Sequence, residues 1–191
     1  YPEVGQEYEF GEGSFTVLGP TQIRDDSNNN SVVVRLDYGD TSFLFTGDAE
    51  SKEEKDIIAA NEDLYCDVLS VGHHGSASST SWDFLEAVLP EYAVISCGVN
   101  NSYGHPDPDT IEKLESIEAQ IFRTDLQGNI IAISDGETIT WNNVPSNGEV
   151  LYAADFVSVK EEPNDTSSTV GELGPGDQIQ VLNRDDDGWA T

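Results

Sequence analysis

The sequence of 191 residues contains no methionine, only two cysteines and three histidines, and no long apolar run. Because the initiator methionine is missing, we expect these residues to be part of a longer protein. The residues after Tyr1 lack the basic start and the apolar stretch of a signal peptide. No stretch approaches the roughly 20 apolar residues of a membrane helix, so we expect no membrane segment within them.

Basic residues are also scarce. Lys and Arg number 8 against 37 Asp and Glu, which gives a formal net charge of −29 at pH 7. Because phosphate binding depends mainly on Lys and Arg, this balance argues against a broad non-specific grip on nucleic acid. The acidic residues are spread through strand and helix patterns, which is not the distribution of a disordered acidic tail. Salt would screen their repulsion, so the charge favours a halophilic source or a secreted acidic protein.

The two cysteines, Cys66 and Cys97, each lie in a predicted buried strand. We interpret them as core residues and not as a disulfide. Two cysteines in a chain of this length are no disulfide framework, so they do not indicate the redox compartment.

Strand and helix patterns alternate over residues 1–141 and predict a layered α/β domain that ends in a hairpin. Strands are expected near residues 15–18, 31–36, 42–45, 67–71, 93–96, 121–123, 130–133 and 138–141. Helices are expected from a capping box at 51–54, over 82–88, and from the Asp-Pro pair at 107–108. Residues 142–149 are polar and predict a linker to a β-rich module over 150–191.

All three histidines lie in glycine-bearing loops directly after predicted strands, and Asp48 has the same kind of position. Loops at the carboxyl ends of strands project side chains into one cleft in layered α/β folds. A carboxylate and neutral imidazoles there suit zinc, manganese or iron. Each residue also has a simpler interpretation: Asp48 as a turn residue, His73 and His74 as solvated side chains, and His105 as a helix cap.

Several blocks of the sequence resemble the conserved blocks of one metallo-β-lactamase branch, the ComEC-like competence proteins. They are Asn-Asn-Asn-Ser at 28–31 with the strand after it, Thr-Gly-Asp at 46–48, Gly-His-His-Gly-Ser at 72–76, Tyr-Gly-His-Pro at 103–106, and Arg-Thr-Asp at 123–125 with Gly128. The likeness runs from about residue 17 to residue 141, in the expected order and spacing.

The resemblance implies an α/β (α+β) fold: the C-terminal half of an αββα sandwich of two β-sheets flanked by helices. It also implies a hydrolase with two divalent metal ions, zinc or manganese, in the full-length protein. Asp48 then matches the bridging carboxylate, and His73 or His74 the later histidine ligand, with His73 preferred because it follows Gly72 directly. His105 would be a catalytic proton donor or a substrate contact. The resemblance further suggests Asn30, Ser31 and Ser76 as substrate-binding residues.

One departure from the family pattern stands beside these matches. The main metal motif, His-x-Asp-x-Asp-His in this branch, should precede residue 28, and residues 1–27 contain no histidine. We therefore expect this chain alone to be inactive and to bind metal weakly or not at all, with the motif in a missing N-terminal half. The alternative is that the motif has been lost.

Residues 150–191 resemble, more weakly, part of a bacterial Src-homology-three-like barrel, with Asp-Gly-Trp at 187–189 near its truncated end. A generic β tail is the alternative. The barrel would bind cell-wall peptidoglycan and implies an extracellular or cell-surface location, with the cytoplasm as the other option.

The expected function is hydrolysis of a phosphodiester, with DNA or a nucleotide as substrate. The other hypotheses are a non-catalytic cell-surface binding protein with a degenerate lactamase-like scaffold, and an acidic halophilic domain with incidental histidines.

Overall fold

The computed structural model describes residues 3–61, 63–147, 149–152, 155–160, 167–175 and 178–181. The chain forms two compact units, Tyr1–Ser146 and Asn147–Thr191. The boundary falls inside the predicted linker. The start of that linker packs on the first unit, since Ser146 donates its backbone N–H to the carbonyl of Ile121 at 2.6 Å.

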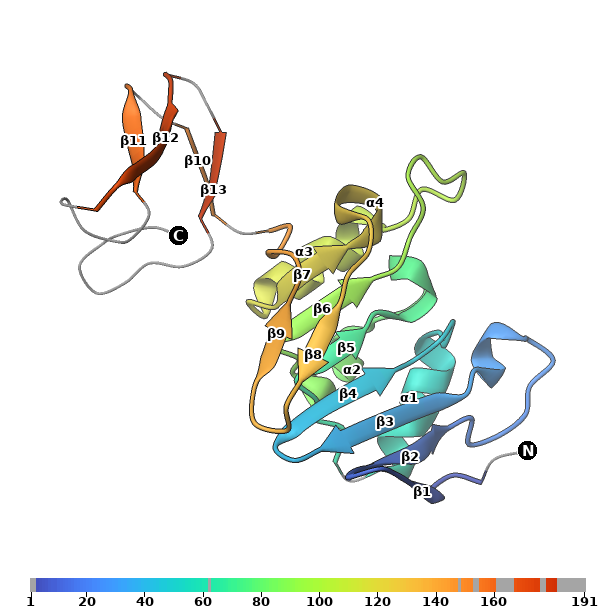
Figure 1. Cartoon of the computed structure of the whole chain (residues 1–191). Coiled ribbons are helices and arrows are strands. Elements are labelled where there is room, and N and C mark those ends of the chain that lie inside the picture. The colour runs from blue at the N-terminus through green and yellow to red at the C-terminus, as the bar shows by residue number, and fades with distance from the viewer. Residues whose placement is uncertain are drawn as a thin grey trace. The chain divides into compact units, whose positions relative to one another are not determined.

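The first unit is built on one mixed sheet with helices beside it (Figure 1). Its strands are β1 (Glu7–Phe10), β2 (Gly13–Gly19), β3 (Val33–Tyr38), β4 (Thr41–Phe45), β5 (Val68–Ser70), β6 (Tyr92–Ile95) and β7 (Gln120–Arg123). Its helices are α1 (Ser51–Ala60), α2 (Trp82–Val88), α3 (Pro108–Ser116) and α4 (Thr124–Gln127), and a hairpin follows, formed by β8 (Ala132–Ser134) and β9 (Ile139–Trp141). The predicted α/β alternation is confirmed, while β1 and α4 were not predicted.

The seven strands lie in the sheet in chain order, from β1 to β7. β1 to β4 pair antiparallel, with short turns between β1 and β2 and between β3 and β4 and a longer loop between β2 and β3. β4 to β7 pair parallel through helical crossovers. The carboxyl ends of β4, β5, β6 and β7 therefore meet at one edge of the sheet, and the loops that leave this edge carry all three histidines.

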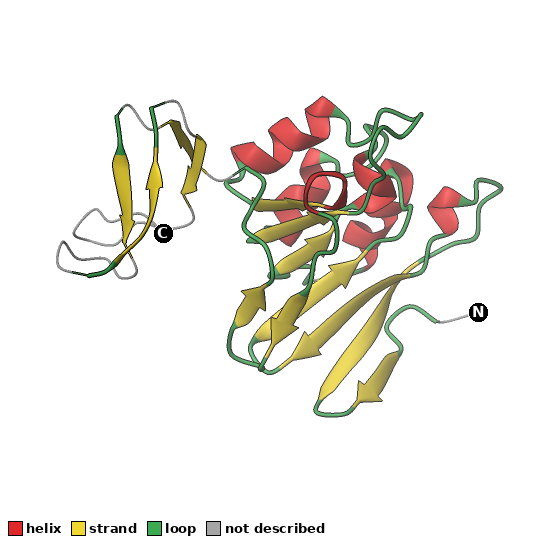
Figure 2. Cartoon of the chain, turned by 45° about the horizontal axis from the view of Figure 1, so that its top comes forward, coloured by secondary structure: helices red, strands yellow, loops and turns green. Residues whose placement is uncertain are grey.

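One face of the sheet is covered by α1, α2 and α3 (Figure 2). Side chains at alternate strand positions enter the core beneath these helices, and the register places Leu44 beside Leu69 and Leu69 beside Ala93. All three are fully buried. Cys66 belongs to the same core, and both cysteines are free, so their interpretation as packing residues is confirmed. Burial raises the pKa of the Cys66 thiol to about 12.

The opposite face is covered at one end by the β8–β9 hairpin. Trp141 of β9 stacks on Phe122 of β7, with ring centroids 4.1 Å apart. The hairpin is tied to the β3–β4 turn, where Asp40 donates its N–H to the carbonyl of Gly136 at 2.6 Å. Gly39 has a positive φ of 58° there, and a Cβ on it would lie 2.2 Å from that carbonyl oxygen. A glycine is therefore required at this contact.

Helix α1 begins at Ser51 as predicted, but the capping-box prediction for residues 51–54 is wrong. The N-cap residue is Glu50, whose side chain makes no capping hydrogen bond, and the Glu53 N–H in the first turn donates to the side chain of Asn29 at 3.1 Å. Glu54 instead accepts hydrogen bonds from the backbone N–H groups of Thr80 and Ser81, just before α2. Leaving buried N–H groups unpaired costs about 1–3 kcal/mol each, so this tertiary contact outweighs the local cap.

The second unit contains four strands in the residues that the structure describes: β10 (Glu149–Tyr152), β11 (Val157–Lys160), β12 (Thr169–Leu173) and β13 (Gln178–Val181). β10 pairs with β13 and β11 with β12, both antiparallel, as two separate sheets. These strands form no closed barrel, so the barrel-like module stays a prediction. The Asp-Gly-Trp run at 187–189 lies outside the described residues.

Candidate functional site

Asp48, His73, His74 and His105 all lie in loops at the carboxyl edge of the parallel strands. Asp48 follows β4, the two adjacent histidines follow β5, and His105 lies in the long loop after β6. In α/β sheets, the loops that follow the carboxyl ends of parallel strands form the usual place for ligand-binding side chains. The structure therefore brings the four side chains predicted from sequence to one edge of the sheet.

Asp48 is held by its backbone, and its carboxylate remains accessible. Its N–H donates to Oγ of Ser31 at 3.0 Å, and that hydroxyl in turn donates to the carbonyl of Asn28 at 2.8 Å. The preceding Gly47 has a φ of 56°, which turns the chain sharply at the strand end. The Asp48 side chain is 46% exposed, so its oxygens are free to meet a ligand.

His74 is the histidine next to this carboxylate. Its Nδ1 lies 2.7 Å from the carbonyl oxygen of Ser96, which can only accept, so Nδ1 carries the hydrogen. The neutral ring then has a bare Nε2, and this atom lies 3.6 Å from Oδ1 of Asp48. Two acceptors that face each other need a proton or a cation between them. A backbone carbonyl that fixes the far nitrogen is also the usual support of a metal-ligating histidine.

His73 faces a different partner. Its Nδ1 lies 3.4 Å from Oε1 of Glu50 and 3.3 Å from Oγ of Ser78. The motif favours His73 over His74 as the ligand, whereas the structure places His74 beside Asp48. The spacing of the motif could not separate two adjacent histidines, because the backbone conformation decides which ring turns toward the carboxylate.

That backbone conformation is unusual. The tight turn Gly72–Gly75 holds His73 at a φ of 49° and His74 at a φ of 58°. Left-handed conformations of non-glycine residues cost about 1–3 kcal/mol each and persist only where the surroundings fix them. Here His73 donates its N–H to the carbonyl of Gly47 at 2.9 Å, which joins the two ligand-bearing loops.

His105 lies beside the pair. Its ring centroid is 5.7 Å from that of His73 and 5.8 Å from that of Tyr103. Asn101 fixes the loop, since its side chain accepts from the His105 N–H at 3.0 Å and donates to the His105 carbonyl at 2.6 Å. The imidazole is thus held near the site by its backbone. Among the described residues, no hydrogen bond to a ring nitrogen fixes which of the two nitrogens carries the hydrogen.

The three residues suggested for substrate binding all have protein partners. The amide of Asn30 accepts from the Arg24 N–H and donates to its carbonyl. Ser31 supports Asp48, as described above, and Ser76 is buried and contacts Ser78 at 3.1 Å. These contacts shape the loops of the site, and the substrate-binding roles stay predictions.

Two buried acidic residues of α1 were not predicted. Glu53 lies behind the loop at 28–31, where one carboxyl oxygen accepts the Ser31 N–H at 3.3 Å. Its other oxygen is buried without a hydrogen-bond partner in the described part of the chain. Burial raises the pKa of Glu53 to about 7. A periodic helix pattern gives no signal for such residues, since acidic side chains are normally assigned to the exposed face.

The donor set is chemically suited to a divalent metal but incomplete. A carboxylate and a neutral imidazole nitrogen are ordinary ligands of zinc and manganese. Among the residues that the structure describes, no group of three or more His, Cys, Asp or Glu is placed to hold a metal ion. Residues 1–191 also contain no His-x-Asp-x-Asp-His motif.

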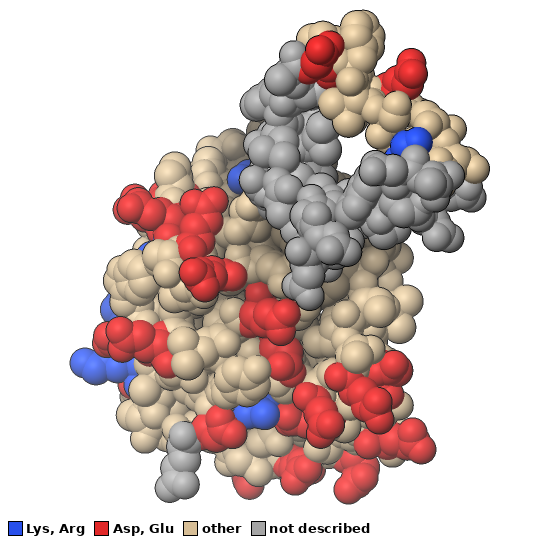
Figure 3. All heavy atoms as spheres, turned by 90° about the vertical axis from the view of Figure 1, so that its left-hand side faces the viewer, with Lys and Arg blue, Asp and Glu red and all other residues tan. Residues whose placement is uncertain are grey.

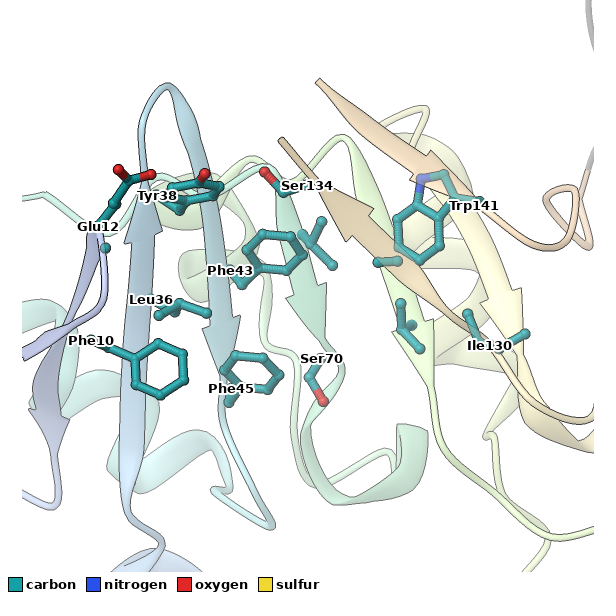
Figure 4. Close-up of a pocket in the computed structure, with 14 residues that line it drawn as sticks. Phe10, Glu12, Leu36, Tyr38, Phe43, Phe45, Ser70, Ile130, Ser134 and Trp141 are labelled. Atoms are coloured by element: carbon teal, nitrogen blue, oxygen red, sulfur yellow. The ribbon is translucent and has the colours of Figure 1, made fainter. Parts of the chain in front are cut away.

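A second concave feature lies over the open face of the sheet (Figure 4). It is a groove of about 590 Å³ whose lining includes Phe10, Phe43, Phe45 and Trp141. Glu12 is the charged residue of this lining, which includes no histidine or cysteine. The groove therefore supplies apolar surface, and the residues suited to chemistry lie at the strand ends.

The comparisons with known proteins agree with this architecture. Residues 6–99 match the metallo-beta-lactamase superfamily. The chain is 38% identical over 117 residues to ComE operon protein 3 of Bacillus subtilis (strain 168), a match that covers 61% of this chain and 15% of that protein. It is 38% identical over 125 residues to competence protein ComA of Neisseria gonorrhoeae, covering 64% and 18%. It is 37% identical over 129 residues to recombination protein 2 of Haemophilus influenzae (strain ATCC 51907 / DSM 11121 / KW20 / Rd), covering 66% and 16%.

These matches span less than a fifth of the length of each relative. None of the helices described is long and apolar enough to cross a membrane. The superfamily is usually hydrolytic and commonly binds divalent metals. The mixed sheet with helices on one face is consistent with its fold. The matched region therefore belongs to the metallo-β-lactamase superfamily, and the chain resembles the ComEC-like competence branch of that superfamily.

Proposed function

We propose that the first unit is part of a metal-dependent hydrolase that cleaves phosphodiester bonds, with Asp48 and His74 as two of its metal ligands. One observation carries the proposal: the bare Nε2 of His74 and Oδ1 of Asp48 lie 3.6 Å apart, with the far nitrogen of His74 held by the Ser96 carbonyl and the backbone N–H of Asp48 held by Ser31. This arrangement accommodates a proton or a cation between the two acceptors, and the superfamily commonly binds divalent cations.

A bound divalent metal would supply a water of lowered pKa and positive charge for the reacting oxygen. The protein's own residues would position the metal ligands and donate a proton. Asp48 and His74 hold their donor atoms in place through Ser31 and the Ser96 carbonyl. His105 is the proposed proton donor to the leaving group. The remaining ligands would come from a His-x-Asp-x-Asp-His motif that residues 1–191 do not contain, and two metal ions, zinc or manganese, would be held.

The substrate is proposed from the relatives and from the charge. Two of the relatives are named for competence and for recombination, which favours DNA. The chain has 37 Asp and Glu against 8 Lys and Arg, and acidic side chains also outnumber basic ones on the face shown in Figure 3, which lies away from the candidate site. Arg24, Arg35 and Arg123 are each ion-paired with an aspartate. A long duplex needs a track of free basic residues. We therefore propose a short single strand or a small phosphodiester as the substrate.

The second unit is proposed to bind cell-wall peptidoglycan, which would place the protein outside the cell or at its surface. The paired strands β10 with β13 and β11 with β12 are compatible with a small β module. Pull-down with isolated peptidoglycan, using residues 147–191 fused to a carrier protein, tests this role. Retention no greater than that of the carrier alone would refute the proposed binding of peptidoglycan.

The hydrolase proposal is tested on the protein expressed from its complete gene. Metal content and hydrolysis of bis-p-nitrophenyl phosphate, with added manganese or zinc, are measured for the wild type, for Asp48→Ala and for Asp83→Ala. Asp83 is an exposed aspartate of α2 and serves as the control for loss of one negative charge.

We expect about two metal ions per wild-type chain, and a loss of at least ~100-fold in kcat/KM in Asp48→Ala because a metal ligand is removed. Asp83→Ala should match the wild type. If the wild type neither binds metal nor hydrolyses the ester, the proposal fails, and the non-catalytic scaffold becomes the better account. Comparing a short single strand with a long duplex then tests the proposed substrate class.

A further inference from the structure

Glu50 is the acidic residue that joins the loops of the site. It is the N-cap residue of α1, two residues after Asp48, and its side chain is 21% exposed. One oxygen accepts from Nδ2 of Asn28 at 3.3 Å and from Oγ of Ser78 at 3.0 Å, and the other from Nδ2 of Asn29 at 3.0 Å. The carboxylate therefore connects the loop before β3, its own loop and the loop after the histidines.

The same carboxylate decides where the hydrogen of His73 lies. Nδ1 of His73 has two neighbours, Oε1 of Glu50 at 3.4 Å and Oγ of Ser78 at 3.3 Å. A carboxylate can only accept. The Ser78 hydroxyl has one hydrogen, which it gives to Glu50, so toward His73 it can also only accept. Both neighbours therefore require the hydrogen on Nδ1.

We infer that Glu50 is a positioning residue that holds His73 as the Nδ1–H tautomer and keeps its Nε2 bare. The Ser96 carbonyl does the same for His74. The two adjacent histidines thus present the same nitrogen unprotonated, although their supports come from different parts of the chain. The tautomer stands on the two neighbours of Nδ1, an ion-pair contact with Glu50 and a hydrogen bond with Ser78. The use of the bare Nε2 in catalysis, to bind metal or to accept a proton, rests on the proposed function.

Glu50 also acts on Asp48 through the loop at 28–31. Asn28 and Asn29 donate their side-chain amides to Glu50, and the carbonyl of Asn28 accepts the Ser31 hydroxyl that in turn receives the Asp48 N–H. Removing the Glu50 carboxylate should therefore loosen the support of Asp48 as well as release His73. It should leave His74 unchanged, since the Ser96 carbonyl has no contact with Glu50 among the described hydrogen bonds.

The test uses ¹⁵N-histidine labelling of the 191-residue chain without metal. The chain contains three histidines, so long-range ¹H–¹⁵N spectra at about pH 9, above the ordinary histidine pKa, show the neutral tautomer of each ring. Single substitutions of the three histidines assign the signals. In the wild type we expect Nδ1–H for both His73 and His74.

Three variants complete the experiment. Glu50→Ala should shift His73 toward the Nε2–H tautomer, because the freed Ser78 hydroxyl can then donate to Nδ1. Ser78→Ala should leave His73 as Nδ1–H, because Glu50 still accepts. Glu86→Gln removes an exposed charge of α2 and should change nothing. His74 reports whether the loop remains folded in each variant.

A wild-type His73 in the Nε2–H form overturns the inference without any variant. An unchanged His73 in Glu50→Ala also overturns it. The catalytic part is read on the complete protein, where Glu50→Ala should lower kcat about 10- to 100-fold, as loss of a ligand's support does. A complete wild-type protein without hydrolase activity would refute the proposed function, while the tautomer result would still stand or fall separately.

Discussion

The two faces of the seven-stranded sheet are built from the same strands but differ in how far their side chains are buried. On β4, Leu44 enters the core under the helices and is fully buried, while its neighbour Phe45 points to the other face and is 43% exposed. Phe10, on β1, is 67% exposed. The helix-covered face is thus a complete core, and the open face is apolar surface that the β8–β9 hairpin covers at one end only (Figures 1 and 4).

This difference shows that the residue pattern of a strand does not by itself identify the face that becomes the core. β4 has large apolar side chains on both faces, Leu44 on one and Phe43 and Phe45 on the other. The helices α1, α2 and α3 cover one of these faces (Figure 2). The difference predicts that stability resides on the covered face, and four substitutions test it.

The largest effect is expected at Leu44. We predict that Leu44→Ala lowers the free energy of unfolding by about 2–5 kcal/mol, because it removes buried methyl groups and leaves a cavity between sheet and helices. Urea unfolding followed by tryptophan fluorescence measures the loss. A loss below about 1 kcal/mol would mean that the covered face is not the core.

The second effect concerns a polar group within the covered face. Glu54 accepts from two backbone N–H groups at the start of α2. In Glu54→Gln, the amide nitrogen must face one of these two donors, so the free energy of unfolding should fall by about 1–3 kcal/mol. The conservative Glu86→Gln, on the exposed side of α2, is the control and should have the stability of the wild type.

The third effect has the opposite sign. Burial raises the pKa of Glu53 from 4.5 to about 7 in the folded protein, so the folded state binds more protons than the unfolded state between these values. The free energy of unfolding therefore falls as the pH rises through this window. Glu53→Gln should be more stable than the wild type at about pH 8, by about 1–3 kcal/mol, and nearly equal to it at about pH 4. Equal stabilities at both pH values would contradict the raised pKa.

The smallest effect is expected on the open face. Phe45→Ala should lower the free energy of unfolding by less than about 1 kcal/mol, since the ring is already half-exposed in this chain. Its comparison with Leu44→Ala on the same strand is the direct test of the two faces. Comparable losses for the two neighbours would show that the open face is packed in solution by something that this structure does not contain.

Much of the architecture could be predicted from local sequence. The Asp-Pro pair at 107–108 begins α3 as expected, since Asp107 accepts from the Asp109 N–H at 3.0 Å and Pro108 occupies the first turn. The hairpin of β3 and β4 and the strands before the histidines were also located correctly. These signals are local: proline fixes φ, a short acidic side chain caps a helix, and alternation defines a strand.

The candidate site was predictable only in part. Glycine-bearing loops after parallel strands indicated that Asp48, His73 and His74 would meet at one edge. Which histidine turns toward Asp48, and the role of Glu50 behind the other, depend on consecutive residues with positive φ and on hydrogen bonds to Ser96 and Ser78. The capping-box prediction was wrong for the same reason, since Glu54 found its partners 26 and 27 residues away.

The sequence by itself determined most of the elements of this protein, its acidic composition and the aspartate and histidines at the site, because these follow from composition and from interactions between near neighbours. The tertiary structure alone decided which face of the sheet became the core, which glutamates were buried and which nitrogen of each histidine stays bare. Those outcomes are set by contacts between segments far apart in the chain. A hydrogen bond to a backbone carbonyl or to a carboxylate far away in the chain changes no sequence pattern near the histidine that it orients, so it cannot be predicted from that pattern.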